Sequence, residues 1–598
     1  MGLYYLLRGA ILLVLGLLIY AQTFQYGFVF DDYIFIVNNP FIKNFHNIHL
    51  MWQAFPVTRL VGMYSFAFNY YFNQLHPAGY HVFNFVVHII AAFLVWALAD
   101  LLFRLAKAPD GYLTKESSFI IALLFLVHPC QTQAVTYITQ RFESMATVFY
   151  LATLYVYLRA RLAVDIKNKM RLFGLATLFT ILGIMTKEVM ITVPVMILAA
   201  EWIFFPGKDK KRLVTIILIA AGGLGLLIFK MVHTGLDVFL SSHLSESHDG
   251  DVLTPLRYLL TQMRVFLTFL RLLVFPVHQN LDYDYPASID LFHPPLTFLG
   301  FAVITGFIFT IIKWRQRFPL IAFGLSWMLI TFSINLVPRN NVIFEHKLYL
   351  ISFGFFLSVV AALSFVVRQR RVFIGIFVFL IMTLAFLSFE RNKVWADELT
   401  LWKNAIQEAP NKARVNSNLG RIYGSKGEYD QAIKYLSRAI VLYPDNITYE
   451  NRGIIYSQMG KTSQALDDLN KSIAMDPNYF STYVKRSWVY QTQHNYQAAL
   501  NDLAQAIKLE PHFTDGYVER GMLWMSLGRN QDAFKDFQTA LSIDPFNYEV
   551  LLRQGAVCLA LEKYDLALEC FNKALSIEPS SGEAAAYKIY CLHQLGRR

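Results

Sequence analysis

Long apolar runs, separated by short polar segments, fill the chain before Leu387 and constrain its fold more than any other feature. A helix needs about 20 mostly apolar residues to cross a bilayer. Hydrophobic residues make up 55% of the chain and charged residues 16%, whereas soluble domains have about 25% charged residues. The sequence therefore predicts an all-α, polytopic membrane domain in residues 1–390. The eleven expected spans are 6–23, 80–103, 117–128, 142–158, 172–186, 188–205, 213–230, 294–312, 319–336, 348–367 and 372–389.

Basic residues divide unevenly between the loops that join these spans. The loops 104–116, 159–171, 206–212, 313–318 and 368–371 carry 18 Lys and Arg in 43 residues, and the alternate loops carry 9 in 145. Basic residues near span ends stay on the cytoplasmic side, so the bias predicts a cytoplasmic N-terminus. We expect span 6–23 to be retained, because it lacks the small-residue cleavage site of a signal peptide.

Two long segments, 24–79 and 231–293, are expected on the outer face. Within the second, the run 254–276 carries Arg257, Arg264 and Arg271. Their spacing of seven residues puts them on one helix face, and each would cost about 2.5 to 3.5 kcal/mol at the centre of a bilayer. We therefore expect an interfacial or re-entrant helix there, with both ends outside.

Prolines recur at a nearly fixed period beyond the last span. They are Pro410, Pro444, Pro477, Pro511, Pro545 and Pro579. A period of about 34 residues is typical of tetratricopeptide repeats, whose paired helices need small residues where they approach closely. The pattern predicts an α-solenoid in residues 391–598. Its parts are a half repeat at 395–410, five repeats at 413–581 and a terminal helix at 583–595.

Solenoids of this kind present a concave groove to protein partners. Asn418 and Asn451 occupy the same position in two successive repeats and are candidates for binding a peptide backbone. The alternative is that they are ordinary surface residues, since later repeats place other residue types there. The net charge of +11 is explained by the basic cytoplasmic loops, and we expect no nucleic-acid partner. Eleven crossings that start from a cytoplasmic N-terminus place the repeats on the outer side of the membrane. We expect either a bacterial or archaeal inner membrane with periplasmic repeats, or an ER membrane with luminal repeats.

Asp31 and Asp32 are adjacent carboxylates just beyond the first span, and such a pair can raise one pKa toward the range of a general base. The alternative is a helix cap or turn. Other ionisable residues gather at the same predicted face, which suggests one polar cavity near the outer leaflet. They are His128, Arg141, Lys187, Glu188, Asp282, Asp284, Arg339, Glu345, His346 and Lys347.

The basic members of this group, Arg141, Lys187, Arg339, His346 and Lys347, are candidates for holding a lipid phosphate while Asp31 or Asp32 deprotonates a hydroxyl. Taken singly, each could instead be an interfacial anchor or an ion-pair partner. The four cysteines lack zinc spacing, and no nucleotide-binding motif occurs. No cofactor or metal is predicted, although a divalent ion is left open.

Several motifs in this order resemble the transmembrane and tetratricopeptide-repeat-containing (TMTC-like) O-mannosyltransferases and their GT-C superfamily relatives. They are FVFDDY, HPAGYHVFNFVVHI, HPCQTQAVTYITQR, MTKE, PVMILAAEW, LRLLVFPVHQNLDYDYP and VIFEHKLYL. The resemblance implies inverting transfer of a sugar from a polyprenyl or dolichyl phosphate to protein. It also assigns the family's acidic pair to Asp31-Asp32, its Lys-Glu element to Lys187-Glu188 and its Glu-His element to Glu345-His346. Lys347 stands where arginine is expected, which keeps the charge but loses bidentate phosphate geometry.

The leading hypothesis is thus a membrane glycosyltransferase that modifies Ser or Thr hydroxyls of a protein on the outer face, with the repeats recruiting the acceptor. Two other hypotheses stay open. One is a membrane-anchored scaffold without catalysis, in which only the repeats act. The other is a lipid-dependent polymerase or ligase of envelope polysaccharides.

Overall fold

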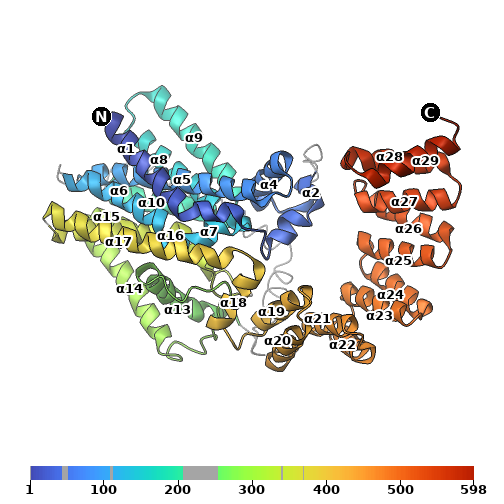
Figure 1. Ribbon diagram of the computed structural model, residues 1–598. Coiled ribbons are helices and arrows are strands. Elements are labelled where there is room, and N and C mark those ends of the chain that lie inside the picture. The colour runs from blue at the N-terminus through green and yellow to red at the C-terminus, as the bar shows by residue number, and fades with distance from the viewer. Residues whose placement is uncertain are drawn as a thin grey trace. The chain divides into compact units, whose positions relative to one another are not determined.

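A computed structural model of the protein describes residues 2–43, 51–107, 112–205, 254–338, 341–367 and 369–597. Within these ranges the chain forms helices and no strands, which confirms the all-α class (Figure 1). The chain divides into two compact units, Met1–Asn411 and Lys412–Arg598, which are called here the membrane unit and the repeat unit.

A helix covers each predicted span that lies in the described residues, whereas 213–230 lies outside them. The helices are α1 (Gly2–Tyr20), α5 (Pro77–Leu105), α6 (Tyr112–Val127), α8 (Arg141–Leu162), α9 (Ile166–Ile184), α10 (Val193–Phe204), α14 (Leu296–Trp314), α15 (Pro319–Phe332), α16 (Leu348–Val366) and α17 (Arg370–Asn392). The multispanning class is confirmed. By length and hydropathy, six described helical stretches could cross a membrane, and a seventh results if the bent pair at 116–136 is one span. The number eleven stays a prediction.

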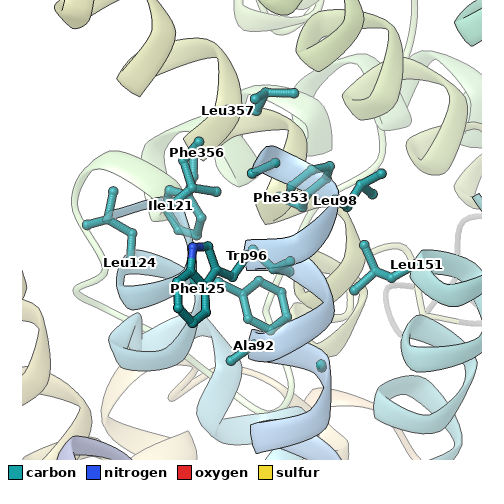
Figure 2. Packing of buried hydrophobic residues seen from close by; sticks show 14 of the residues in the cluster. Ala92, Trp96, Leu98, Ile121, Leu124, Phe125, Leu151, Phe353, Phe356 and Leu357 are labelled. Carbon is teal, nitrogen blue, oxygen red and sulfur yellow. The ribbon is translucent and has the colours of Figure 1, made fainter. Parts of the chain in front are cut away.

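The core of the membrane unit is an apolar cluster around α5. The ring of Trp96 on α5 lies 5.2 Å from that of Phe119 on α6. Figure 2 shows how α5, α6, α8 and α16 contribute to the cluster through Ala92, Trp96, Leu98, Ile121, Leu124, Phe125, Leu151, Phe353, Phe356 and Leu357. Dispersion and close packing hold such helices together in lipid, because the tails are as apolar as the side chains.

Helices α15 and α16 approach most closely where two glycines meet. A Cβ on Gly324 would lie 2.5 Å from the Gly354 oxygen, and a Cβ on Gly354 would lie 2.5 Å from the Gly324 oxygen. Small residues are the usual means by which membrane helices bring their backbones together. The crossing therefore depends on both glycines.

The arginine-rich run forms helix α13 (Pro255–Val274), which packs on α14 and α15. Arg264 is buried and donates to the Pro286 carbonyl at 3.1 Å, with its guanidinium 4.7 Å from the centre of the Tyr285 ring. Phe266 and Phe269 of α13 pack against Phe332 of α15. Arg264 thus faces protein, whereas Arg271 on the same helix is exposed. The interfacial or re-entrant placement of α13 stays a prediction.

The repeat unit consists of five helix pairs and a terminal helix, which confirms the predicted solenoid. The pairs are α19 (Ala413–Ser425) with α20 (Tyr429–Leu442), α21 (Asn446–Gln458) with α22 (Thr462–Met475), α23 (Phe480–Thr492) with α24 (Tyr496–Leu509), α25 (Thr514–Ser526) with α26 (Asn530–Ile543), and α27 (Tyr548–Ala560) with α28 (Tyr564–Ile577), followed by α29 (Gly582–Gln594). Gly420 is required because a Cβ there would lie 2.7 Å from Leu436 Cγ. The predicted half repeat forms α18 (Glu398–Glu408), which belongs to the membrane unit.

An arginine and an aspartate sixteen residues later form a bidentate pair in three successive repeats. Arg486 Nε and Nη2 donate to the two carboxylate oxygens of Asp502 at 2.8 and 2.7 Å. Arg452 with Asp468 and Arg520 with Asp536 repeat this geometry. The pairs tie the two helices of each repeat together, and the sequence analysis overlooked them although they recur at the repeat period.

Candidate active site

The acidic pair lies in a tight turn after the first span. The helical stretch Ala21–Gln25 (η1) continues α1, and the single turn Tyr33–Val37 (η2) follows the pair. The Asp32 N–H donates to the Val29 carbonyl at 3.0 Å, which closes the turn. Phe30, directly before the pair, has a φ of 50° in the left-handed region, where a side chain is disfavoured.

Asp32 has no exposed surface and anchors the turn. Its Oδ2 accepts from the Val29 N–H at 3.1 Å, and its Oδ1 accepts from the Thr139 N–H at 2.8 Å and from the Thr139 hydroxyl. Burial raises the pKa of Asp32 to about 7, although these hydrogen bonds act in the opposite direction. Asp32 thus fixes the turn to the segment Ile138–Gln140 (η6).

Asp31 is partly exposed, in contrast to its neighbour. Its backbone N–H donates to the Tyr137 hydroxyl at 3.1 Å. Only one of the two adjacent residues therefore has exposed surface. The geometry assigns the structural role to Asp32 and leaves Asp31 as the candidate base.

Arg141 is fully buried at the start of α8. Its Nε donates to Asn84 Oδ1 at 2.6 Å, Nη1 to the Ser65 carbonyl at 3.2 Å and Nη2 to the Tyr80 carbonyl at 3.0 Å. The guanidinium also lies 4.2 Å from the centre of the Phe83 ring. All three nitrogens bind the chain itself, which gives Arg141 a role in the fold. Its suggested contact with a lipid phosphate stays a prediction.

Lys187 and Lys347 line one small recess together with Glu143, Glu188 and Thr331. Lys187 Nζ lies 2.7 Å from Glu143 Oε2, and both side chains are almost fully buried. Glu188 instead pairs at 3.0 Å with Arg59, which comes from the segment 24–79. The recess, called here the lysine recess, therefore contains lysines from two of the predicted motifs.

Glu345 is buried and anchors the segment after α13. It accepts from the Asn280 N–H at 2.7 Å, from Gln279 Nε2 at 3.2 Å and from the Tyr283 hydroxyl. The next residue, His346, is 7% exposed, and its ring lies 5.3 Å from that of Phe344. Glu345 thus stabilises the fold. Its contacts also position Lys347, two residues later, at the recess.

Three of the remaining predicted residues lie in the described part of the chain. His128 is buried, with Nδ1 accepting from the Cys130 N–H at 3.3 Å and Nε2 lying 3.2 Å from the Leu273 carbonyl, so both ring nitrogens serve the fold. Asp282 is buried, whereas Asp284 is exposed. Arg339 lies outside the described residues.

In the repeat unit, Asn418 Nδ2 donates to the Arg414 carbonyl of its own helix at 2.9 Å. Asn451 is half-buried on the next repeat. Both positions lie on the first helix of a repeat, as the period requires. Their suggested contact with a bound peptide stays a prediction.

The start of α8 lies between the acidic turn and the lysine recess. Thr139, just before α8, holds Asp32, and Glu143, in its first turn, holds Lys187. Glu143, Thr139 and Tyr137 were not predicted from the sequence, although Thr139 and Tyr137 lie inside the motif HPCQTQAVTYITQR. Among the described residues no cluster of three or more His, Cys, Asp or Glu has the arrangement of a metal site.

Tetratricopeptide repeat models match residues 411–478, 484–548 and 548–581 of the chain. A protein O-mannosyl-transferase of Caenorhabditis elegans is 27% identical and covers 73% of this chain and 62% of its own length. Protein O-mannosyl-transferase TMTC3 of Homo sapiens is 25% identical and covers 72% of this chain and 50% of its own. The chain thus spans between 50% and 62% of the length of these two relatives.

Among solved structures, the crystal structure of MamA protein is 24% identical, with a TM-score of 0.25, over 28% of this chain and 92% of that one. A thermophilic TPR protein of Thermus thermophilus is 21% identical, with a TM-score of 0.26, over 30% of this chain and 99% of that one. The curated relatives, in contrast, extend over most of this chain and confirm the resemblance that the motifs predicted.

Proposed function

We propose that this chain, which resembles the TMTC-like protein O-mannosyltransferases, is a membrane glycosyltransferase of the GT-C type. In this proposal it transfers a sugar from a polyprenyl or dolichyl phosphate to a Ser or Thr hydroxyl of a protein. The names of its curated relatives favour mannose as the sugar. The observation that carries the proposal is the acidic turn, where one carboxylate is buried as an anchor and its neighbour is left accessible.

In the proposed reaction Asp31 accepts the proton of the acceptor hydroxyl as its oxygen attacks the anomeric carbon. The bond between that carbon and the lipid phosphate oxygen breaks, and the lipid phosphate leaves with the electron pair. Attack from the face opposite the leaving group inverts the anomeric configuration. A general base of this kind contributes roughly 10²- to 10⁴-fold to a rate.

The lysine recess is the proposed place for the departing phosphate. Lys187 and Lys347 both line the recess, and fixed cations stabilise the negative charge that develops on a leaving phosphate. Glu143 and Glu188 offset this charge, so the two lysines line the recess without an excess of buried positive charge. Lysines bind phosphate as point charges, which agrees with a lysine at position 347.

The repeat unit is the proposed docking surface for the protein acceptor, since solenoids of this class bind extended chains. In the proposed topology the N-terminus is cytoplasmic, and the acidic turn and the repeats lie on the periplasmic or luminal side. The sugar-linked lipid is then a co-substrate taken from the membrane. No step of the mechanism requires a metal ion.

The test is Asp31→Asn in the full-length chain, reconstituted in proteoliposomes with tritium-labelled mannosyl phosphoryl polyprenol and a Ser/Thr-rich peptide. We expect transfer to the peptide to fall by at least about 100-fold, because the amide cannot accept the proton. Asp430→Asn, an exposed acid-to-amide change on α20, serves as the matched control and should transfer at the wild-type rate.

Three results would contradict the proposal. Wild-type transfer by Asp31→Asn would remove Asp31 as the base. Absence of transfer to any peptide, with labelled glycan formed instead, would favour a polysaccharide polymerase or ligase. A chain that transfers nothing and still captures protein partners would favour the scaffold.

A further inference from the structure

Helix α18 reads in the sequence as part of an incomplete repeat, yet it packs within the membrane unit. Asp397 caps its N-terminus by accepting from the Thr400 N–H at 2.9 Å. Trp402 on this helix is fully buried, whereas Gln407 on the opposite side is exposed. The buried side of α18 contacts the turn that carries the acidic pair.

Two contacts join α18 to Phe30, the residue directly before Asp31. The Phe30 N–H donates to Glu398 Oε1 at 3.2 Å, and the Phe30 ring meets that of Trp402 edge to face at 5.3 Å. The left-handed φ of Phe30 is disfavoured for a residue with a Cβ, so the surroundings must hold it. Glu398 and Trp402 supply that restraint.

A second path leads from the same segment to Asp31 itself. The Asp31 N–H donates to the Tyr137 hydroxyl, and the Tyr137 ring stacks on Trp395 at 5.3 Å with an angle of 18° between the planes. Trp395 lies three residues before Glu398. Two consecutive backbone N–H groups of the acidic turn therefore donate to groups that the segment 395–402 supplies or holds in place.

We propose that Glu398 and Trp402 are positioning residues of the transferase, which set the direction in which Asp31 presents its carboxylate to the acceptor. The inference rests on the proposed function, since it needs Asp31 as the base. Neither residue touches the substrate. A displacement of about 1 Å in a catalytic group costs on the order of 100-fold in rate, so loss of the restraint on Phe30 has a measurable effect.

The experiment compares Glu398→Ala, Glu398→Gln and Glu398→Asp in the full-length chain, in the same proteoliposome assay. Glutamine keeps an acceptor oxygen at the same reach, whereas aspartate keeps the charge but withdraws the oxygen from the Phe30 N–H. We expect Glu398→Ala and Glu398→Asp to lower kcat about 10- to 100-fold with an unchanged KM for the labelled lipid, because the lysine recess is intact. Glu398→Gln should stay within about threefold of wild type, a change of under 1 kcal/mol.

Gln407→Ala, on the exposed side of the same helix, is the matched control and should behave as wild type. Trp402→Phe, which keeps an aromatic edge, should lose less kcat than Glu398→Ala. If Glu398→Ala does not fold, the comparison of Glu398→Gln with Glu398→Asp decides, and equal kcat in these two variants overturns the inference.

If kcat falls together with the melting temperature and glutamine does not restore it, the role of Glu398 is merely structural and the inference is overturned. Asp31→Asn is measured in parallel. If Asp31→Asn is inactive while Glu398→Ala matches wild type, only the positioning role fails. If Asp31→Asn is active, the proposed function fails first.

Discussion

The two units satisfy their buried charges in different ways. In the repeat unit, Arg486 finds Asp502 only 16 residues along the chain, and the neighbouring repeats do the same. In the membrane unit, Arg141 reaches partners 57 to 76 residues away, and Asp32 reaches Thr139 across 107 residues. Local pairing leaves a period in the sequence that can be read. Long-range pairing leaves none, and each buried group then depends on the whole fold.

The largest expected effect follows from this difference and concerns Arg141. Replacing it with methionine would leave Asn84 Oδ1 and the carbonyls of Ser65 and Tyr80 buried without their donor. We expect the membrane unit to lose about 3 to 5 kcal/mol of stability, seen as a lower melting temperature in detergent. Arg159→Met, at an exposed position of the same helix, should change it little. If the Arg141→Met chain is as stable as wild type and has lost only its binding of the lipid-linked sugar, Arg141 is a phosphate ligand as first predicted.

The second effect tests the repeat unit. Arg486→Ala leaves the Asp502 carboxylate, which is 6% exposed, without its bidentate partner. We expect a loss of about 2 kcal/mol, measured by chemical denaturation and confined to the repeat unit. The exposed pair of Lys471 with Asp467 gives the control, because Lys471→Ala should cost less than about 0.5 kcal/mol. Equal effects of the two substitutions would erase the distinction drawn for the buried pairs.

The smallest effect is a pH dependence of the membrane unit. The folded-state pKa of Asp32 lies at about 7, above its ordinary value, so the folded state binds the proton more tightly than the unfolded state. This contribution is fully present below about pH 4 and is lost as the pH rises through about 7. From pH 8 to pH 6 the wild type should gain up to about 1.4 kcal/mol relative to Asp32→Asn, measured as the difference in melting temperature at each pH. A constant difference would mean that Asp32 keeps an ordinary pKa.

The sequence predicted the helices well, because apolar length and a period of 34 residues are local signals. The residues that make the site were harder to predict. Asp31 and Asp32 are chemically identical, and only the turn shows that one is buried and the other accessible. Glu143 was missed because a single carboxylate at the edge of an apolar run gives no hint that Lys187 lies against it.

Arg141 shows the opposite case. Its place beside a predicted span end suggested an anion ligand, whereas its partners come from α4 (Leu60–Asn73) and α5, which the sequence does not place beside it. The bidentate Arg–Asp pairs could have been found, since they follow the repeat period. They do not belong to the small residues and prolines that define the repeat, so the repeat pattern alone does not predict them.

The crossing of α15 and α16 at Gly324 and Gly354 holds the two helices at a fixed separation. Thr331 lies at the end of one helix and Lys347 at the start of the next, and both line the lysine recess. Because the backbones touch at Gly324 and Gly354, neither helix can slide along the other without a steric clash. The width of the recess is therefore set at the helix crossing, by two residues that carry no side chain at all.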